Sequence, residues 1–158
     1  MSKQKIYIDT SIISHLRHED APEKMQETIA FWEEIKAGKY EIVISPFTLL
    51  ELQRCPEPKQ TELLELLESI RYTLLPETDE VRSLVKAYLE EGVLTPRNEG
   101  DLLHIAFAVM SGCDAIASWN FKHMVRMTTI QRVRAVNAQR GYSKLLDIVS
   151  PTMLIGGE

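Results

Sequence analysis

The chain has 158 residues, of which 44% are hydrophobic and 26% are charged, and its formal net charge is −5. This length and composition exclude an intrinsically disordered protein and predict a single domain over residues 1–158. The sequence contains no apolar run approaching the roughly 18 residues of a transmembrane helix and no N-terminal signal-peptide pattern, so we expect a cytoplasmic protein with no membrane association. Cys55 and Cys113 lie far apart and outside any CxxC motif, which argues against a disulfide framework and a zinc site.

Strands and helices alternate along the sequence. Short apolar runs predict strands at residues 5–9, 41–44, 71–75, 114–118 and 145–149. Apolar residues at helical spacing, together with capping and stop signals, predict helices at residues 10–16, 22–37, 46–54, 60–70, 78–90, 101–111 and 129–139. The alternation predicts an α/β fold with a doubly wound, largely parallel sheet of four to five strands and helices on both faces.

The first strand ends on a carboxylate. Lys5-Ile6-Tyr7-Ile8 is followed by Asp9, and the polar pair Thr10-Ser11 then opens a helix. Residues just past the carboxyl ends of parallel strands line the region where ligands bind, so Asp9 is a candidate ligand for a cation. The alternative is that Asp9 only caps the helix that follows it, because Asp is a favoured N-cap residue.

Two further acids stand in comparable places. Glu51 lies on the helix that follows the second strand, where Phe47 and Leu50 are expected to face the core. Asp101 lies in the first turn of the most apolar helix, where a capping box with Asn98 or the helix dipole would also explain an acid. Capping does not explain why all three acids occur at strand ends or at adjoining helix starts, and we therefore treat them as candidates for one site.

A basic segment follows the fourth predicted strand. Residues 115–146 contain no Asp or Glu but include His123 and six cationic side chains, at Lys122, Arg126, Arg132, Arg134, Arg140 and Lys144. In an acidic protein, this asymmetry favours a surface that docks a polyanion beside the acids. The alternative is an ordinary solvated helix face.

Four short motifs, taken together, resemble those of the PIN-domain ribonucleases, and among them the VapC-like toxins of type II toxin–antitoxin systems. The motifs are Ile6-Tyr7-Ile8-Asp9-Thr10-Ser11, Ser45-Pro46 leading to Leu50-Glu51, Asp101-Leu102-Leu103-His104-Ile105-Ala106, and Ala117-Ser118-Trp119-Asn120. The resemblance implies a PIN-like, Rossmann-like fold and hydrolysis of RNA phosphodiester bonds. It also implies that Asp9, Glu51 and Asp101 bind Mg²⁺ or Mn²⁺, that Ser11 assists them, and that the partners are an RNA substrate, a cognate antitoxin and a second copy of the chain.

One position departs from that family. Many members carry a fourth acid just after the fourth strand, whereas residues 118–123 of this chain are Ser, Trp, Asn, Phe, Lys and His. Asn120 can still ligate a cation through its carbonyl oxygen or through a water, but it adds no charge. Asp114 lies at the start of the strand and so at the wrong end. A catalytically weak or inactive RNA-binding protein of the same fold therefore remains an alternative.

The remaining polar residues receive more ordinary roles. We expect Lys122, His123 and Arg126 to contact substrate phosphates, and His104 to be a satisfied helix residue. A phosphatase of the haloacid-dehalogenase kind also begins with an Asp at the end of a strand. That class of enzyme needs a second acid two residues later, where this chain has Ser11.

Overall fold

The structure, a computed structural model, describes residues 3–156, so residues 1–2 and 157–158 of the predicted domain lie outside it. The strands are β1 (Gln4–Ile8), β2 (Tyr40–Ile44), β3 (Thr73–Leu74), β4 (Ala115–Ala117) and β5 (Asp147–Val149). The helices are α1 (Thr10–His15), α2 (Pro22–Lys36), α3 (Pro46–Gln53), α4 (Lys59–Glu68), α5 (Asp79–Glu90), α6 (Glu99–Met110) and α7 (Met127–Gln139). Two short 3₁₀ helices, η1 (Pro96–Asn98) and η2 (Pro151–Met153), complete the described elements.

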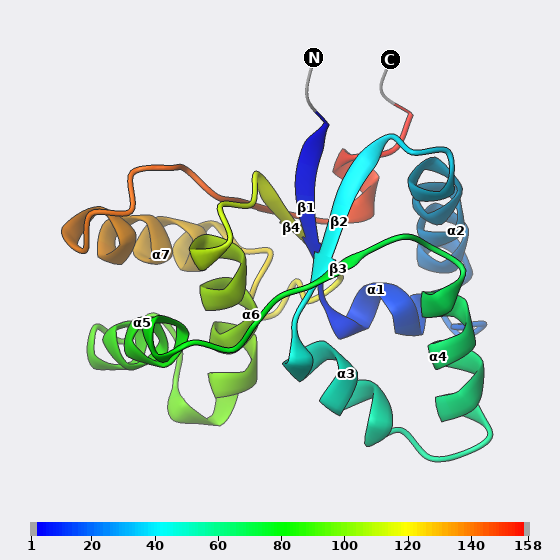
Figure 1. Ribbon diagram of the computed structural model, residues 1–158, viewed down its shortest axis with the longest axis horizontal. Coiled ribbons are helices and arrows are strands. Elements are labelled where there is room, and N and C mark those ends of the chain that lie inside the picture. Colours follow the sequence, from blue (N-terminus) through cyan, green and yellow to red (C-terminus); the bar gives the residue numbers. More distant parts are fainter. Residues whose placement is uncertain (1–2, 157–158) are drawn as a thin grey trace.

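The five strands form one parallel sheet with the order β3-β2-β1-β4-β5. Ile6 of β1 lies opposite Ile42 on one side and Ala115 on the other. The chain winds outward from β1 to β3 and then crosses to β4 on the other side of β1, which confirms the predicted doubly wound α/β architecture (Figure 1). The switch in winding direction therefore falls between the carboxyl ends of β1 and β4, where ligands bind in sheets of this kind.

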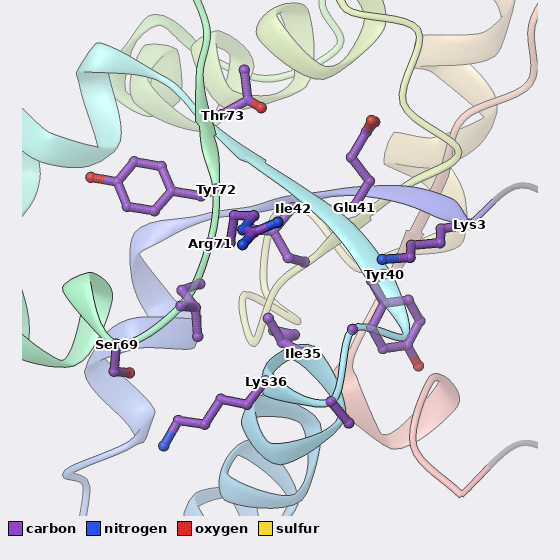
Figure 2. A pocket seen from close by; sticks show the side chains of 13 residues that line it. Lys3, Ile35, Lys36, Tyr40, Glu41, Ile42, Ser69, Arg71, Tyr72 and Thr73 are labelled. Atoms are coloured by element: carbon purple, nitrogen blue, oxygen red, sulfur yellow. The ribbon is translucent and has the colours of Figure 1, made fainter.

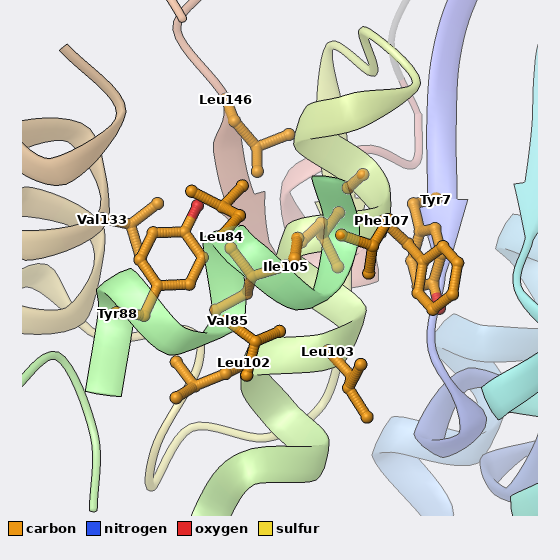
Figure 3. Packing of buried hydrophobic residues seen from close by; sticks show 14 of the residues in the cluster. Tyr7, Leu84, Val85, Tyr88, Leu102, Leu103, Ile105, Phe107, Val133 and Leu146 are labelled. Atoms are coloured by element: carbon orange, nitrogen blue, oxygen red, sulfur yellow. The ribbon is translucent and has the colours of Figure 1, made fainter. Parts of the chain in front are cut away.

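Alternating strand residues build a separate core on each face of the sheet. Ile6 and Ile8 of β1 point to the face covered by α1, α2 and α4, where they pack with residues such as Phe31. Tyr7, between them, points to the opposite face, and its cluster includes residues of α5, α6 and α7 such as Leu84 (Figure 3). The helices thus lie in two layers with the strands between them, and both cores hold the ends of β1 and β4 in place.

Three local predictions were inaccurate. The third strand is only Thr73–Leu74, because the segment before it diverges from β2. The sixth helix begins at Glu99 instead of Asp101, and the Asn98 amide donates to the Thr95 hydroxyl over 3.1 Å, so the capping box that was the alternative explanation for Asp101 does not form. Leu50, predicted to face the core, is 42% exposed.

Other sequence predictions agree with the structure. Cys113 is buried and Cys55 is half-buried, and both are free thiols. Within residues 3–156, no helix is both long enough and apolar enough to cross a bilayer. The helix predicted at residues 60–70 is α4, and it contributes Leu63 and Leu67 to the core.

Candidate active site

Asp9 lies directly after β1, at the switch in winding direction, and only 4% of its surface is exposed. Its Oδ1 accepts hydrogen bonds from the backbone N–H of Ser11 over 3.0 Å and from the Ser11 hydroxyl over 2.5 Å. Its Oδ2 accepts from the Ser118 hydroxyl, also over 2.5 Å. Asp9 therefore does cap α1, as the alternative interpretation held, but its second oxygen faces β4. Burial raises the pKa of this carboxyl even though the two serines oppose the shift.

Glu51 reaches the same end of the sheet from α3. The helix begins with Ser45 as its N-cap, and Pro46 takes the first position, where the missing N–H costs nothing. Oε1 of Glu51 accepts from Nε2 of His104 over 2.7 Å and from the Thr10 hydroxyl. Burial acts to raise the pKa of Glu51, but these two donors outweigh it and the net pKa shift is downward.

His104 connects Glu51 to the core. It lies on α6, is 3% exposed, and its Nδ1 is 2.6 Å from the Tyr7 hydroxyl, which in turn contacts the Ser45 hydroxyl at 2.7 Å. Because an ionised carboxylate can only accept, Nε2 must donate to Glu51. In the neutral imidazole, this assignment leaves Nδ1 to accept from the Tyr7 hydroxyl. A continuous buried network therefore fixes the side chain of Glu51 from behind.

Asp101 is the third residue of α6 and lies close to α3 because Gly100 precedes it. A Cβ atom built on Gly100 would lie 3.0 Å from the ring of Phe47, so the glycine permits a close approach of the two helices. Burial raises the pKa of Asp101, the negative charge of Asp9 adds to that rise, and a hydrogen bond with the Asn120 side chain lowers it.

The three acids influence one another electrostatically. The charge of Glu51 raises the pKa of Asp9 further, and the charge of Asp9 raises the pKa of Asp101 further. His104 lowers the pKa of all three carboxyls. Within residues 3–156, however, no three His, Cys, Asp or Glu side chains are gathered so as to hold a metal ion among them. Hydroxyl groups donate hydrogen bonds to the carboxylate oxygens of Asp9, and the His104 imidazole donates one to Glu51.

The chemistry of the donors nevertheless fits a hard divalent cation. Mg²⁺ prefers oxygen ligands, keeps several waters and is commonly held by one or two carboxylates. Asp9 supplies a buried carboxyl and Asp101 a half-buried one, the raised pKa values of both reflect unfavourable ionisation, and a cation would offset that cost. Glu51, whose side chain is 32% exposed, is positioned to act directly or through a water.

The loop after β4 contributes neutral groups to this site. The Ser118 hydroxyl accepts from the backbone N–H of Asn120 over 3.0 Å while it donates to Asp9. Oδ1 of Asn120 accepts from the backbone N–H of His123 over 2.9 Å, so its amide nitrogen is the group left to donate to Asp101. Asn120 thus lies beside Asp101, the position where an acid would add a fourth charge.

The basic segment divides into two groups. Lys122 and Arg126 are exposed in the loop after β4, and His123 beside them acts electrostatically on Asp101. The more distant cations make structural contacts: Arg134 lies 2.8 Å from Asp147, and Lys144 lies 3.1 Å from Asp114. Only the first group lies next to the acids.

Two other features lie at the opposite end of the sheet. Asp114 precedes β4 and accepts from the backbone N–H of Lys5 over 2.7 Å, which places it at the amino end of the strand as predicted. A groove of about 1180 Å³ runs between the first half of β2 and the segment leading into β3, with Lys3, Arg71 and Tyr72 among its lining residues (Figure 2). This groove is remote from the carboxyl ends of the strands and is separate from the acids.

Sequence reasoning undervalued two residues of the site. His104 is satisfied by hydrogen bonds, as expected, but one of those bonds is to a candidate ligand. Ser118 was noted only as part of a neutral stretch, although it follows β4 just as Asp9 follows β1. The rule that singled out Asp9 would also have singled out Ser118.

Comparison with known proteins supplies a family. A family model described as the PIN domain matches residues 6–122. The match extends from β1 into the loop after β4 and so includes all three acids, Ser11, Asn120 and Lys122. No curated protein gives a match.

Proposed function

The chain belongs to the PIN-domain family, most of whose members are metal-dependent nucleases, and on that premise we propose that it hydrolyses RNA phosphodiester bonds with Mg²⁺ or Mn²⁺. The observation that carries the proposal is the position of Asp9. A buried carboxylate lies at the switch in winding direction, where Glu51 acts on it electrostatically and it acts in turn on Asp101. Structural capping alone requires neither that burial nor those neighbours.

In this proposal, the three acids would hold the ion. Asp9 and Asp101 would ligate it directly, and Glu51 would ligate it directly or through a water, with His104 fixing the Glu51 side chain. A bound divalent ion lowers the pKa of an attacking water and stabilises charge on the phosphate. Ser11 holds the Asp9 carboxylate in one orientation, and the neutral amide of Asn120 supports Asp101.

The cations of the neighbouring loop would hold the substrate. Lys122, His123 and Arg126 contact phosphates on either side of the scissile bond in this proposal, because they lie in the loop that also carries Asn120. Such contacts contribute affinity that is independent of sequence and sensitive to salt. They do not by themselves define which RNA is cut.

More specifically, we propose that the chain is the toxin of a toxin–antitoxin pair and acts as a homodimer. Its support is the VapC-like spacing of the four sequence motifs. Expression of the wild-type chain should then arrest growth, expression of Asp9→Asn should not, and the product of a neighbouring reading frame should relieve the arrest. If the wild-type chain has measurable ribonuclease activity but does not affect growth, the toxin role is rejected and only the ribonuclease activity is retained.

The deciding experiment for the enzyme is cleavage of a labelled RNA with Mn²⁺, with EDTA, and with Asp9→Asn. We expect cleavage only by the wild-type protein with the metal. Binding of RNA without cleavage at any metal concentration would favour the alternative of an inactive RNA-binding protein, for which the neutral Asn120 is the supporting feature.

A further inference from the structure

Four aromatic rings form a continuous run beside Asp9. His18 and His15 are stacked almost parallel, with ring centroids 4.5 Å apart and an interplanar angle of 8°. The ring of His15 lies 5.7 Å from that of Trp119 at an interplanar angle of 33°, and the ring of Trp119 lies 5.9 Å from that of Phe121 in a T-shaped arrangement at 73°. These residues come from α1, the loop after it and the loop after β4, so the fold brings the run together from distant parts of the sequence.

Trp119 anchors the run. It is 6% exposed, its Nε1 donates to the Thr28 hydroxyl over 2.8 Å, and its backbone N–H donates to the Ser11 hydroxyl over 2.9 Å. Nδ1 of His15 donates to the backbone carbonyl of Ser11 over 2.7 Å, which fixes the plane of that ring. The central rings are therefore held rigidly, and Ser11 attaches both of them to the Asp9 carboxylate.

The ends of the run remain accessible. Phe121 is 46% exposed, and His18 is half-buried. Nζ of Lys24 lies 5.2 Å from the ring centroid of Phe121 and 5.7 Å from that of Trp119, so a cation accompanies the rings. An exposed flat ring, a rigid aromatic support and an adjacent ammonium group together match the chemistry that binds unpaired nucleotides, whose bases stack while their phosphates need a positive charge.

We propose that the ring run of His18, His15, Trp119 and Phe121, with Lys24, is a nucleobase platform that receives an unpaired base of single-stranded RNA next to the acids. This inference rests on the proposed function only in taking that RNA to be the substrate. The base stacks on the partly exposed ring of Phe121, and Lys24 neutralises the adjoining phosphate. A base-paired nucleotide has both faces covered by its neighbours and does not fit, so the platform selects single-stranded segments.

The test compares a short labelled oligouridylate with an abasic ribose-phosphate chain of equal length, both in EDTA so that nothing is cleaved. Phe121→Ala should weaken binding of the oligouridylate by roughly fivefold to a hundredfold, the range expected for loss of one base–aromatic stack, and should leave the abasic chain unaffected. Phe121→Trp should restore affinity, since any flat aromatic ring can stack. Leu145→Ala, which removes another exposed apolar side chain, is the matched control.

The outcomes separate this inference from the proposed function. The platform would be overturned if wild type and Phe121→Ala bound the oligouridylate equally well. It would also be overturned if Phe121→Ala lost the same affinity for the abasic chain as for the oligouridylate, whether or not the protein cleaves RNA. Phe121-dependent binding of the oligouridylate without any Mn²⁺-dependent cleavage would retain the platform and reject the nuclease. A Phe121 effect of the same size on an RNA duplex would overturn the selection of unpaired bases, and oligodeoxyuridylate distinguishes RNA from single-stranded nucleic acid in general.

Discussion

Oγ of Ser118 donates a 2.5 Å hydrogen bond to Oδ2 of Asp9, and this bond joins the residues that follow β4 and β1. The two strands are neighbours in the sheet although more than a hundred residues of chain separate them. The bond therefore ties the candidate metal ligand to the loop that carries Asn120 and the exposed cations. The orientation of that loop and the orientation of the carboxylate are thus linked.

Asp9→Asn should abolish Mn²⁺-dependent RNA cleavage without unfolding the protein. Because burial raises the pKa of Asp9 in the folded state, ionisation destabilises the metal-free protein progressively from about pH 4, the ordinary value, up to the raised pKa. The metal-free variant should therefore be at least as stable as wild type at neutral pH and should lose that advantage in acid. Thermal unfolding in EDTA at several pH values measures this difference.

The same melts with added Mn²⁺ test ligation directly. A ligand that binds only the folded state raises the melting temperature by mass action, so wild type should gain stability and Asp9→Asn should gain much less. An equal gain for both proteins would remove Asp9 from the metal site.

Glu51→Gln should show the opposite dependence on pH. The donors on Glu51 lower its pKa in the folded state, so its stabilising contribution is present above about pH 4 and is lost as pH falls through the lowered value. Removing the charge should cost about 1 kcal/mol at neutral pH, because charge-assisted bonds from His104 and Thr10 become neutral ones and the site is partly open to solvent. Urea unfolding in EDTA across the acid range should show the difference from wild type vanish at low pH. A difference in unfolding free energy that does not change with pH would contradict a lowered pKa of Glu51 in the folded state.

Much of the fold could be predicted because its determinants are local. Apolar runs ending in polar residues marked all five strands, and glycines such as Gly38 and Gly112, which have positive φ, marked helix ends. The short third strand was overestimated because nothing in Arg71 or Tyr72 signals that the chain has not yet joined β2. Edge pairing depends on a neighbouring strand, and the sequence of one segment does not contain that information.

The placement of the three acids at one end of the sheet could also be predicted, since each follows a strand or begins a helix that the topology brings there. Their hydrogen-bond partners could not. The contact between His104 and Glu51 joins residues 53 positions apart, and it depends on the close approach of α6 to α3 at Gly100. Likewise, the sequence alone did not indicate that Arg134 and Lys144 pair with Asp147 and Asp114.

Tyr7→Phe should disturb the site through His104. The hydroxyl of Tyr7 is buried between His104 and Ser45, and its removal should destabilise the protein by about 1–3 kcal/mol because buried polar partners lose their bond. Tyr88→Phe is the matched control, since it deletes a buried hydroxyl that donates to Asn137 over 2.6 Å in the core on the same face of the sheet. Both variants should lose stability, but only Tyr7→Phe should change Mn²⁺ affinity. Equal Mn²⁺ affinities in the two variants would mean that the network does not position Glu51.

Reversing the charges of Lys122 and Arg126 to Glu should weaken binding of RNA broadly across sequences. Each lost phosphate contact should reduce the slope of log affinity against log salt by about 1, because fewer counterions are released. Lys86→Glu, which makes one such charge reversal at an exposed position on α5, is the net-charge control for each single reversal, Lys122→Glu or Arg126→Glu. If the salt dependence of RNA binding is unchanged in the double variant, Lys122 and Arg126 do not contact phosphates and the loop is an ordinary solvated surface.

Asn120→Asp should increase affinity for divalent ions and weaken the metal-free protein. The new carboxylate can still accept from the His123 backbone, but it can no longer donate to Asp101 and adds a charge beside an acid whose pKa burial already raises. The loss of stability in EDTA should therefore be largest at neutral pH and should shrink as acid protonates the pair, whereas Mn²⁺ should restore more stability to the variant than to wild type. Gln131→Glu makes the same neutral-to-acid change at an exposed position on α7 and should leave Mn²⁺ affinity unaltered. If Mn²⁺ titrations of Asn120→Asp and wild type coincide, Asn120 does not contribute to the metal site, and Asp9, Glu51 and Asp101 alone would have to supply the ligands.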